Sequence, residues 1–183
     1  MRVKQLGDPV LRKVSNPVDV DDIQSGKFNP VIEQMCSVLN GIQAISPENG
    51  NAISAPQIGS HIRLVLLRID GEFLELFNPS FTPLDETTFL FEEECFSFYQ
   101  IRGKVLRHLH IQVDYLDRHG KQQSIAFSGE FSGIAQHEID HLDGVLFIDR
   151  VEDTQTICSI DYVYAKQPKR LQQVKRMFEY MVG

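Results

Sequence analysis

Apolar side chains recur every three or four positions in three stretches of this 183-residue chain, and this period predicts amphipathic helices. The first helix should begin at the cap Asn29, before Pro30, and a second should span Gly129 to Leu142. A third is expected from about Pro168 to Met181, and a short helical turn at 8–15. The positions predicted to face the core are Val31, Met35, Leu39 and Ile42 in the first helix, Phe131, Ile134 and Leu142 in the second, and Leu171, Val174, Met177 and Phe178 in the third.

Strands are predicted between these helices, where β-branched and aromatic residues are concentrated. They cover residues 62–69, 73–78, 89–98, 110–116 and 123–127. The turn 117–120 predicts a hairpin between the last two, and the Gly, Asn, Ser and Pro residues of 46–60 predict a loop. We therefore expect an α+β fold with mixed or antiparallel β-sheets around the central helix, and with the C-terminal helix across the outside.

Composition narrows the classes of protein that fit this pattern. A chain of 183 residues with 42% hydrophobic content is sufficient for one core, so residues 1–183 are predicted to form a single domain. The net charge of -7 argues against direct binding to DNA or to an anionic membrane, because both require a basic surface. The absence of a secretory apolar core or a bilayer-length apolar stretch, and an odd number of cysteines, predict a cytoplasmic protein with reduced thiols.

The segment Gln136-His137-Glu138-Ile139-Asp140-His141 contains a His-Glu-x-x-His motif on the predicted central helix. Positions i and i+4 of a helix lie one above the other, so His137 and His141 can present two imidazole nitrogens to one metal ion. Glu138 is the candidate general base, able to accept a proton from an activated water and return it to a leaving amine. Asp140 or a backbone carbonyl could orient one histidine. The alternative is a chance match, in which both histidines are satisfied core residues.

Two histidines leave a tetrahedral metal short of a third protein ligand, because a catalytic site keeps one position for water. Cys95 is the best candidate, since no second cysteine lies near it to suggest a structural four-cysteine cluster. A thiolate with two imidazoles is a soft ligand set that suits iron(II) as well as zinc.

Three segments in fixed order resemble the motifs of peptide deformylases. The family motif Gly-x-Gly-Leu-Ala-Ala-x-Gln resembles residues 50–57, Glu-Gly-Cys-Leu-Ser resembles residues 93–97, and Gln-His-Glu-x-Asp-His is matched in full by residues 136–141. Asp8-Pro9-Val10-Leu11-Arg12 also has a counterpart in that family, so the resemblance covers nearly the whole chain.

The resemblance implies hydrolysis of the N-formyl group from the initiating methionine of nascent polypeptides, with release of formate. It implies a single divalent metal, commonly iron(II) in the cell and often replaced by zinc. The Gln57 side chain and the Phe96 backbone N–H would stabilise the oxyanion, and an N-formylated peptide or nascent chain would be the partner. The implied metal ligands are Cys95, His137 and His141, the implied base is Glu138, and the implied substrate-binding residues are Gly50, Asn51, Ala52, Glu94 and Arg102.

Two positions depart from the family pattern, because Ala52 and Glu94 each replace a glycine. A Cβ at such a position can narrow the approach of substrate backbone. Glu94 also adds a charge, which could point into solvent, narrow the methionine pocket or repel an acidic peptide. Ser54, Phe96 and Tyr99 differ from the family as well, so we expect a remodelled groove and reduced or narrowed activity.

Two other functions fit parts of the sequence. A zinc endopeptidase also uses His-Glu-x-x-His but takes its third ligand downstream, where Asp149, Glu152 and Asp153 lie. A non-catalytic or differently specific deformylase-like protein could instead bind peptide without turnover, as the changes at Ala52 and Glu94 would allow. The basic residues of the C-terminal helix suggest ribosome docking, or a merely solvated face; they are Lys166, Lys169, Arg170, Lys175 and Arg176.

Overall fold

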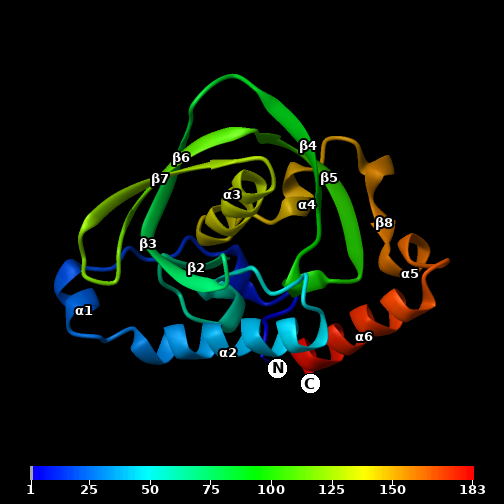
Figure 1. Cartoon of the computed structure of the whole chain (residues 1–183), viewed down its shortest axis with the longest axis horizontal. Coiled ribbons are helices and arrows are strands. Elements are labelled where there is room, and N and C mark those ends of the chain that lie inside the picture. The colour runs from blue at the N-terminus through cyan, green and yellow to red at the C-terminus, as the bar shows by residue number, and fades with distance from the viewer. Residues whose placement is uncertain (1) are drawn as a thin grey trace.

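Two antiparallel sheets surround one helix, α3 (Glu130–Leu142), in this computed structural model, which describes residues 2–183 (Figure 1). The larger sheet has the strand order β1-β2-β3-β6-β7, and the smaller has the order β4-β5-β8. The strands are β1 (Ala52–Ser54), β2 (Leu64–Ile69), β3 (Glu72–Pro83), β4 (Thr88–Glu93), β5 (Ile101–His108), β6 (His110–Leu116), β7 (Gln122–Ser128) and β8 (Cys158–Ser159). The fold is therefore α+β, as the sequence predicts.

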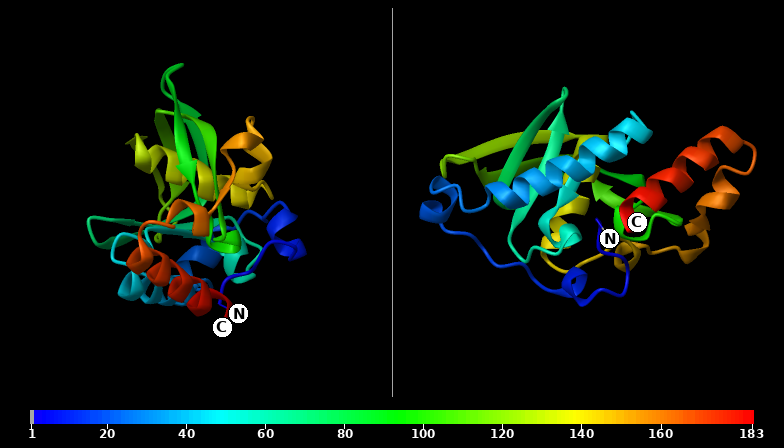
Figure 2. Two further views of the ribbon diagram at one scale, coloured as in Figure 1. Left: turned by 90° about the vertical axis from the view of Figure 1, so that its right-hand side faces the viewer. Right: turned by 90° about the horizontal axis from the view of Figure 1, so that it is seen from below.

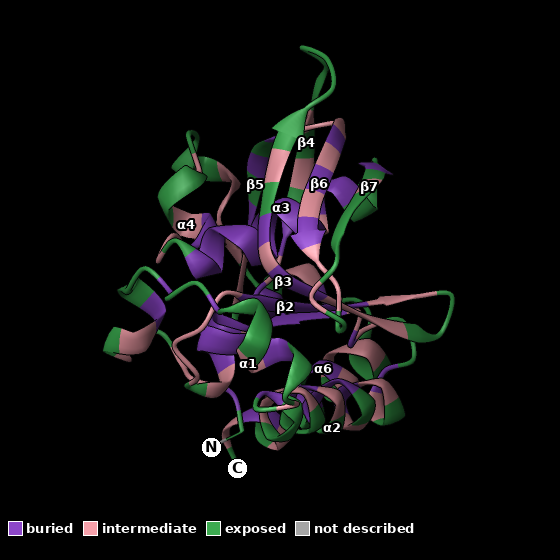
Figure 3. Ribbon diagram, turned by 90° about the vertical axis from the view of Figure 1, so that its left-hand side faces the viewer, coloured by how far each residue is buried: buried purple, intermediate pink, exposed green. Residues whose placement is uncertain are grey.

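Strand β2 is buried on both faces because helices cover both sides of the larger sheet. Leu64 and Leu66 pack into the cluster formed with α2 (Asn29–Ile45), whereas Val65 and Leu67 pack with α3. Strand β6 instead alternates, with Ile111, Val113 and Tyr115 turned toward α3, because its other face is partly open. The burial colouring in Figure 3 follows this arrangement, with the interior of the larger sheet buried and the outer surfaces of the helices exposed.

The C-terminal helix α6 (Pro168–Val182) packs beside α2 and brings the chain ends together (Figures 1 and 2). The backbone N–H of Arg2 donates to the carbonyl of Met181 at 2.9 Å. Gly41 lets the two helices approach closely, since a Cβ there would overlap the phenol of Tyr180, whose hydroxyl donates to the Ser37 carbonyl. The remaining α-helices of residues 2–183 are short; they are α1 (Val20–Gln24), α4 (Phe147–Arg150) and α5 (Ile160–Val163).

Several details of the sequence prediction are wrong. The segment 46–60 contains β1 and the 3-10 helix Ala55–Ile58 rather than only loop, because its Ile53 is fully buried and pairs with β2. Strand β5 was missed, and β4 ends at Glu93 rather than continuing to residue 98. Asn29 is the first helical residue after Phe28, not the cap, and Phe131 is 41% exposed because the buried face of α3 is centred on the motif itself.

Replacing Gly41 by alanine should lower the free energy of unfolding by about 1–3 kcal/mol, because the new methyl group forces Tyr180 out of place. In a Tyr180→Ala background the same change should be neutral or stabilising by up to about 1 kcal/mol, since alanine favours the helix. Urea unfolding of the four proteins measures both values. Equal losses in the two backgrounds would contradict the contact between α2 and α6 as the cause.

Candidate metal centre and substrate groove

The two motif histidines lie one turn apart on the buried face of α3. Their ring centroids are 4.9 Å apart and the rings meet edge to face. Every residue from Ala135 to Leu142 is buried, which is unusual for a segment with four ionisable side chains. Buried ionisable groups persist only where partners compensate for the loss of water, so this helix face requires a set of polar partners.

Cys95 completes a cluster of three candidate ligands. It lies two residues after the end of β4, and its extended backbone directs Sγ to within 3.3 Å of His141 Nε2. One ligand atom from each of Cys95, His137 and His141 lies within 4.8 Å of the others, and all three residues are buried. A thiolate and two imidazoles are ligands suited to zinc or iron(II), so these residues fit a divalent metal.

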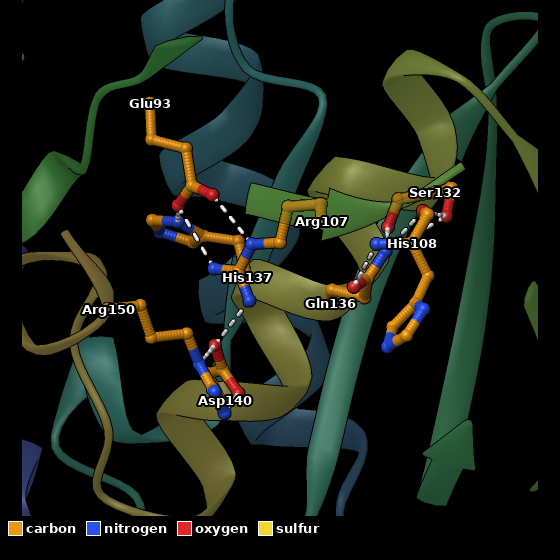
Figure 4. Close-up of polar contacts among 8 residues, drawn as sticks. All are labelled: Glu93, Arg107, His108, Ser132, Gln136, His137, Asp140 and Arg150. Carbon is orange, nitrogen blue, oxygen red and sulfur yellow. Dashed lines mark hydrogen bonds and ion pairs between the residues drawn. The ribbon is translucent and has the colours of Figure 1, made fainter. Parts of the chain in front are cut away.

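A network of charged side chains begins at the Nδ1 atom of His137 and fixes the orientation of its ring (Figure 4). The Glu93 carboxylate lies 2.6 Å from His137 Nδ1, which leaves Nε2 for a metal. Arg107 on β5 binds both oxygens of Glu93, at 2.7 and 3.1 Å, and also the Asp140 carboxylate at 2.6 Å. Arg150 completes the chain of charges by binding both oxygens of Asp140. The sequence prediction for Asp140 is thus wrong, because Glu93 orients the histidine and Asp140 faces the two arginines.

Burial and nearby charges have opposite effects on the pKa values of the two buried carboxyl groups of this centre, Glu93 and Glu138. Burial alone would raise the pKa of Glu93, but its bonds to His137 and Arg107 outweigh burial and lower it. Glu138 has no such cationic clamp, so burial raises its pKa to about 7 despite the nearby His137. A carboxyl group with a pKa near neutrality is suited to both accepting and returning a proton.

Gln57 is held with its amide nitrogen toward the cluster. Its Oε1 accepts hydrogen bonds from the Ser54 backbone N–H at 2.9 Å and from the Ser54 hydroxyl at 3.2 Å. The Nε2 group lies 3.7 Å from Cys95 Sγ and 3.5 Å from Ser97 Oγ. Phe96 begins the 3-10 helix Phe96–Phe98, and the first N–H groups of a helix have no partner within it. Both groups are therefore donors beside the candidate metal ligands.

A cavity of about 280 Å³ opens from this centre to the surface. Phe91 forms one wall and packs where α3 has Gly133, since a Cβ at Gly133 would lie 2.5 Å from its ring. The other predicted groove residues also line the cavity; these are Gly50, Asn51, Ala52, Glu94 and Arg102. Glu94 forms an ion pair with Arg102, so its side chain is only 16% exposed and is not a solvated one.

The comparisons with known proteins agree with this geometry. The family model for polypeptide deformylase matches residues 1–156. The chain belongs to the polypeptide deformylase family. A peptide deformylase of Treponema pallidum is 35% identical over 153 residues, which cover 84% of this chain and 89% of that protein.

Solved deformylase structures share the fold. A peptide deformylase of Synechococcus elongatus in complex with actinonin has a TM-score of 0.74 and 28% identity, covering 93% of this chain and 87% of its own. A Met-Ala-Ser bound deformylase of Acinetobacter baumannii has a TM-score of 0.72 and 26% identity, covering 81% of this chain and 96% of its own. The present chain is accordingly an enzyme of the peptide deformylase class.

The downstream carboxylates that an endopeptidase would use are not in this deformylase centre. Asp149 pairs with Arg12, and Glu152 and Asp153 are exposed. Within residues 2–183, the one group of three His, Cys, Asp or Glu residues close enough to share an ion is Cys95, His137 and His141. The endopeptidase interpretation thus lacks a third ligand.

Sequence reasoning missed the charged residues that contact the candidate metal ligands. Arg107 was overlooked because strand β5 was overlooked; the alternation of Gly103, Val105 and Arg107 on its buried face was the available signal. Glu93 occupies the buried side of β4 in the same way. An arginine and a glutamate at inward positions of paired strands are a recognisable sign of a buried ion pair.

Replacing Arg107 by methionine should lower the free energy of unfolding by about 3–5 kcal/mol, because it removes the main cationic partner of a buried carboxylate. The matched change Arg12→Met breaks a half-exposed pair with Asp149 and should cost less than about 1 kcal/mol. Chemical denaturation of both variants measures the difference. Similar losses of unfolding free energy in the two variants would show that burial does not increase the contribution of the Arg107 ion pair to stability.

Proposed function

We propose that this protein hydrolyses the N-formyl group from the N-terminal methionine of nascent polypeptides and releases formate. The observation that carries the proposal is the convergence of Cys95, His137 and His141 beside the Gln57 amide and Glu138. Membership of the deformylase family supports the same reaction.

Cys95, His137 and His141 would hold the divalent metal. When bound, the metal supplies a Lewis acid that lowers the pKa of a coordinated water and polarises a carbonyl. The Glu138 carboxylate accepts the proton of the attacking water and returns it to the leaving amine. Its pKa of about 7 suits both halves of this transfer.

Gln57 Nε2 and the Phe96 N–H would stabilise the negative charge that develops on the formyl oxygen. Fixed donors are effective because they need no reorganisation during the reaction, and the Ser54 bonds to Gln57 Oε1 provide that fixation. Ser54 is therefore a positioning residue in this proposal. Iron(II) and zinc both remain candidates for the metal, since the ligand set suits either.

The peptide would extend the larger sheet at β1. Within the described chain β1 pairs only with β2, so its other edge is available to an added strand. Gly50 precedes β1 with a φ of 82°, and a Cβ there would lie 2.6 Å from the Leu39 carbonyl, so a glycine is required. The Met-Ala-Ser bound relative supports a peptide in this groove.

Ala52 and Glu94 both line the cavity, where they would narrow the groove without closing the centre. The Glu94 side chain is drawn to Arg102, whereas its neighbours Glu93 and Cys95 face the ligand cluster. We therefore expect turnover of formylated peptides, with a narrower choice of peptide, rather than a non-catalytic binding protein. If the metal-loaded protein releases no formate from formyl-Met-Ala-Ser and the Glu94→Gly variant does, then Glu94 is inhibitory instead.

Ribosome docking and a cytoplasmic location stay predictions. Two of the five basic residues on and before α6 are already paired, Arg170 with Glu48 and Lys175 with Asp161, which leaves Lys166, Lys169 and Arg176 for a partner. Between residues 2 and 183, no helix combines the length and apolar character needed to span a bilayer.

Glu138→Gln should reduce kcat for formyl-Met-Ala-Ser by about 10²- to 10⁴-fold, because the general base is lost. Metal content should be unchanged, since Glu138 is not a ligand in this proposal. Formate release and metal analysis on anaerobically purified, iron-loaded protein measure the two effects. Glu152→Gln, an exposed control, should retain full activity; failure of the native protein on every formylated peptide would reject the proposed function.

Cys95→Ala should abolish stoichiometric metal binding and formate release together, because it removes one of three ligands. The control Cys158→Ala removes a half-buried thiol on β8 and should leave both unchanged. Metal per chain after dialysis is the measurement. Full occupancy in Cys95→Ala would revive the endopeptidase alternative.

A further inference from the structure

The cavity lies between two walls that are far apart in the sequence. One wall includes the loop between α2 and β1, residues 46–51, which we call the α2–β1 loop. The other is the segment 91–102, which runs from β4 to the start of β5. Because β1 follows the α2–β1 loop directly, the position of this loop affects the β1 edge with which the peptide would pair.

Arg170, near the beginning of α6, holds the α2–β1 loop. Its Nη1 group donates to the Ser46 hydroxyl at 2.7 Å and pairs with the Glu48 carboxylate. Ser46 is fully buried, and its hydroxyl also accepts a hydrogen bond from the Asn49 side chain at 2.8 Å. One guanidinium on α6 therefore contacts the loop at two residues and a third through Ser46.

Gln173 lies one turn after Arg170 and binds the end of α2. Its Nε2 group donates to the Ile45 carbonyl at 2.9 Å, and its Oε1 accepts a hydrogen bond from Arg170 at 2.7 Å. The last carbonyls of a helix have no partner within it, so Gln173 satisfies one of them. The last residue of α2 and the loop that follows it are thus both fixed by α6.

Tyr164 connects Arg170 to the opposite wall of the cavity. The centre of its buried ring lies 5.6 Å from the guanidinium carbon of Arg170 and 5.0 Å from that of Arg102. Arg102 also donates to the Tyr164 hydroxyl and pairs with Glu94. Contacts therefore run without a break from Glu94 on one wall to Glu48 on the other.

Tyr164, Arg170 and Gln173, which we call the C-terminal clamp, lie outside the family match at residues 1–156. We propose that the clamp keeps the two walls of the groove in the position that binds the peptide backbone, with Arg170 as its principal positioning residue. This inference rests on the proposed function and adds to it a residue that acts through the α2–β1 loop.

The clamp is expected to act on binding rather than on the chemical step. A loop that is ordered only when the peptide arrives loses conformational entropy at that moment, which weakens binding. A loop already ordered by Arg170 avoids this cost. The reacting groups have other supports, because Glu93 and Arg107 hold His137 and Ser54 holds Gln57.

The test is steady-state formate release by iron-loaded Arg170→Met on formyl-Met-amide, formyl-Met-Ala and formyl-Met-Ala-Ser. We expect KM for formyl-Met-Ala-Ser to rise by about tenfold while kcat stays within about twofold, because the variant loses preorganised binding. Formyl-Met-amide has no following residue and makes the fewest contacts with the β1 edge, so its KM should change least. A general loss of structure would affect all three substrates alike.

Two further variants of α6 accompany Arg170→Met. Gln173→Leu removes the bond to the Ile45 carbonyl without changing charge, and it should raise KM in the same order of substrates by a smaller factor. Arg176→Met removes the same charge as Arg170→Met from an exposed position of the same helix and should leave every KM unchanged. If Arg170→Met does not fold, Gln173→Leu decides between the same outcomes.

Hydrogen exchange reports on the clamp without any substrate. Fragments covering residues 46–52 should exchange faster in Arg170→Met than in the native protein or Arg176→Met, whereas fragments of β6 should exchange at the native rate. Unchanged exchange in residues 46–52, or an equal rise in KM for all three substrates, would overturn the clamp.

Binding without turnover separates this inference from the proposed reaction. Formyl-Met-Ala-Ser is titrated by calorimetry into zinc-loaded Glu138→Gln, with and without Arg170→Met. Weaker binding and faster loop exchange with Arg170→Met, together with no turnover by the native protein, would support the clamp and reject the deformylase reaction. Turnover by the native protein, with KM and loop exchange unchanged in Arg170→Met, would do the reverse.

Discussion

The bond between Glu93 and His137 joins the two halves of this structure. Glu93 ends β4 of the smaller sheet, whereas His137 belongs to the helix that the larger sheet covers. Arg107 also binds the carboxylate and so stabilises the pair, although Glu93 and His137 are only 2% and 8% exposed. Because Cys95 follows Glu93 by two residues, the same contact that orients the histidine also sets the distance of the thiol from α3. The ligand geometry thus depends on the docking of one strand end.

The sequence predicted which residues come together at this centre better than it predicted the structure around them. His137 and His141 share a helix face because helical spacing is a local property, and Cys95, the candidate third ligand, lies beside them in the fold. Strand β5 was missed because its exposed positions include Lys104 and Leu106, which blur the alternation, and with it the buried Arg107. Phe131 was misjudged for a related reason: an apolar stripe predicts the buried face of a helix only if polar residues stay outside, and here the motif itself is inside.

Tertiary contacts also determine the direction of the Glu94 side chain, which the local sequence pattern does not specify. The sequence allowed a solvated side chain, a narrowed pocket or a repulsive charge. Glu94 is the first residue after β4, and its side chain is directed by its ion pair with Arg102, which precedes Gly103, the β5 partner of Glu93. The position of Arg102 depends in turn on Tyr164, some sixty residues later, and no periodicity in the sequence connects these positions.

The side chain of Glu94, next to the candidate metal ligand Cys95, need not act on the reaction itself. The ligand cluster and the Gln57 donor are held by Glu93, Arg107 and Ser54, none of which contacts Glu94 through a hydrogen bond within the described chain. The centre and the groove therefore have separate supports, one beneath α3 and one from the segment that follows residue 156. Changes in the segment that follows residue 156 can alter which peptide enters the groove, while the residues beneath α3 keep the positions of the reacting groups unchanged. This separation explains how a chain can keep Cys95, His137, His141 and Glu138 together in one buried centre while Glu94 and Arg102 vary the entrance.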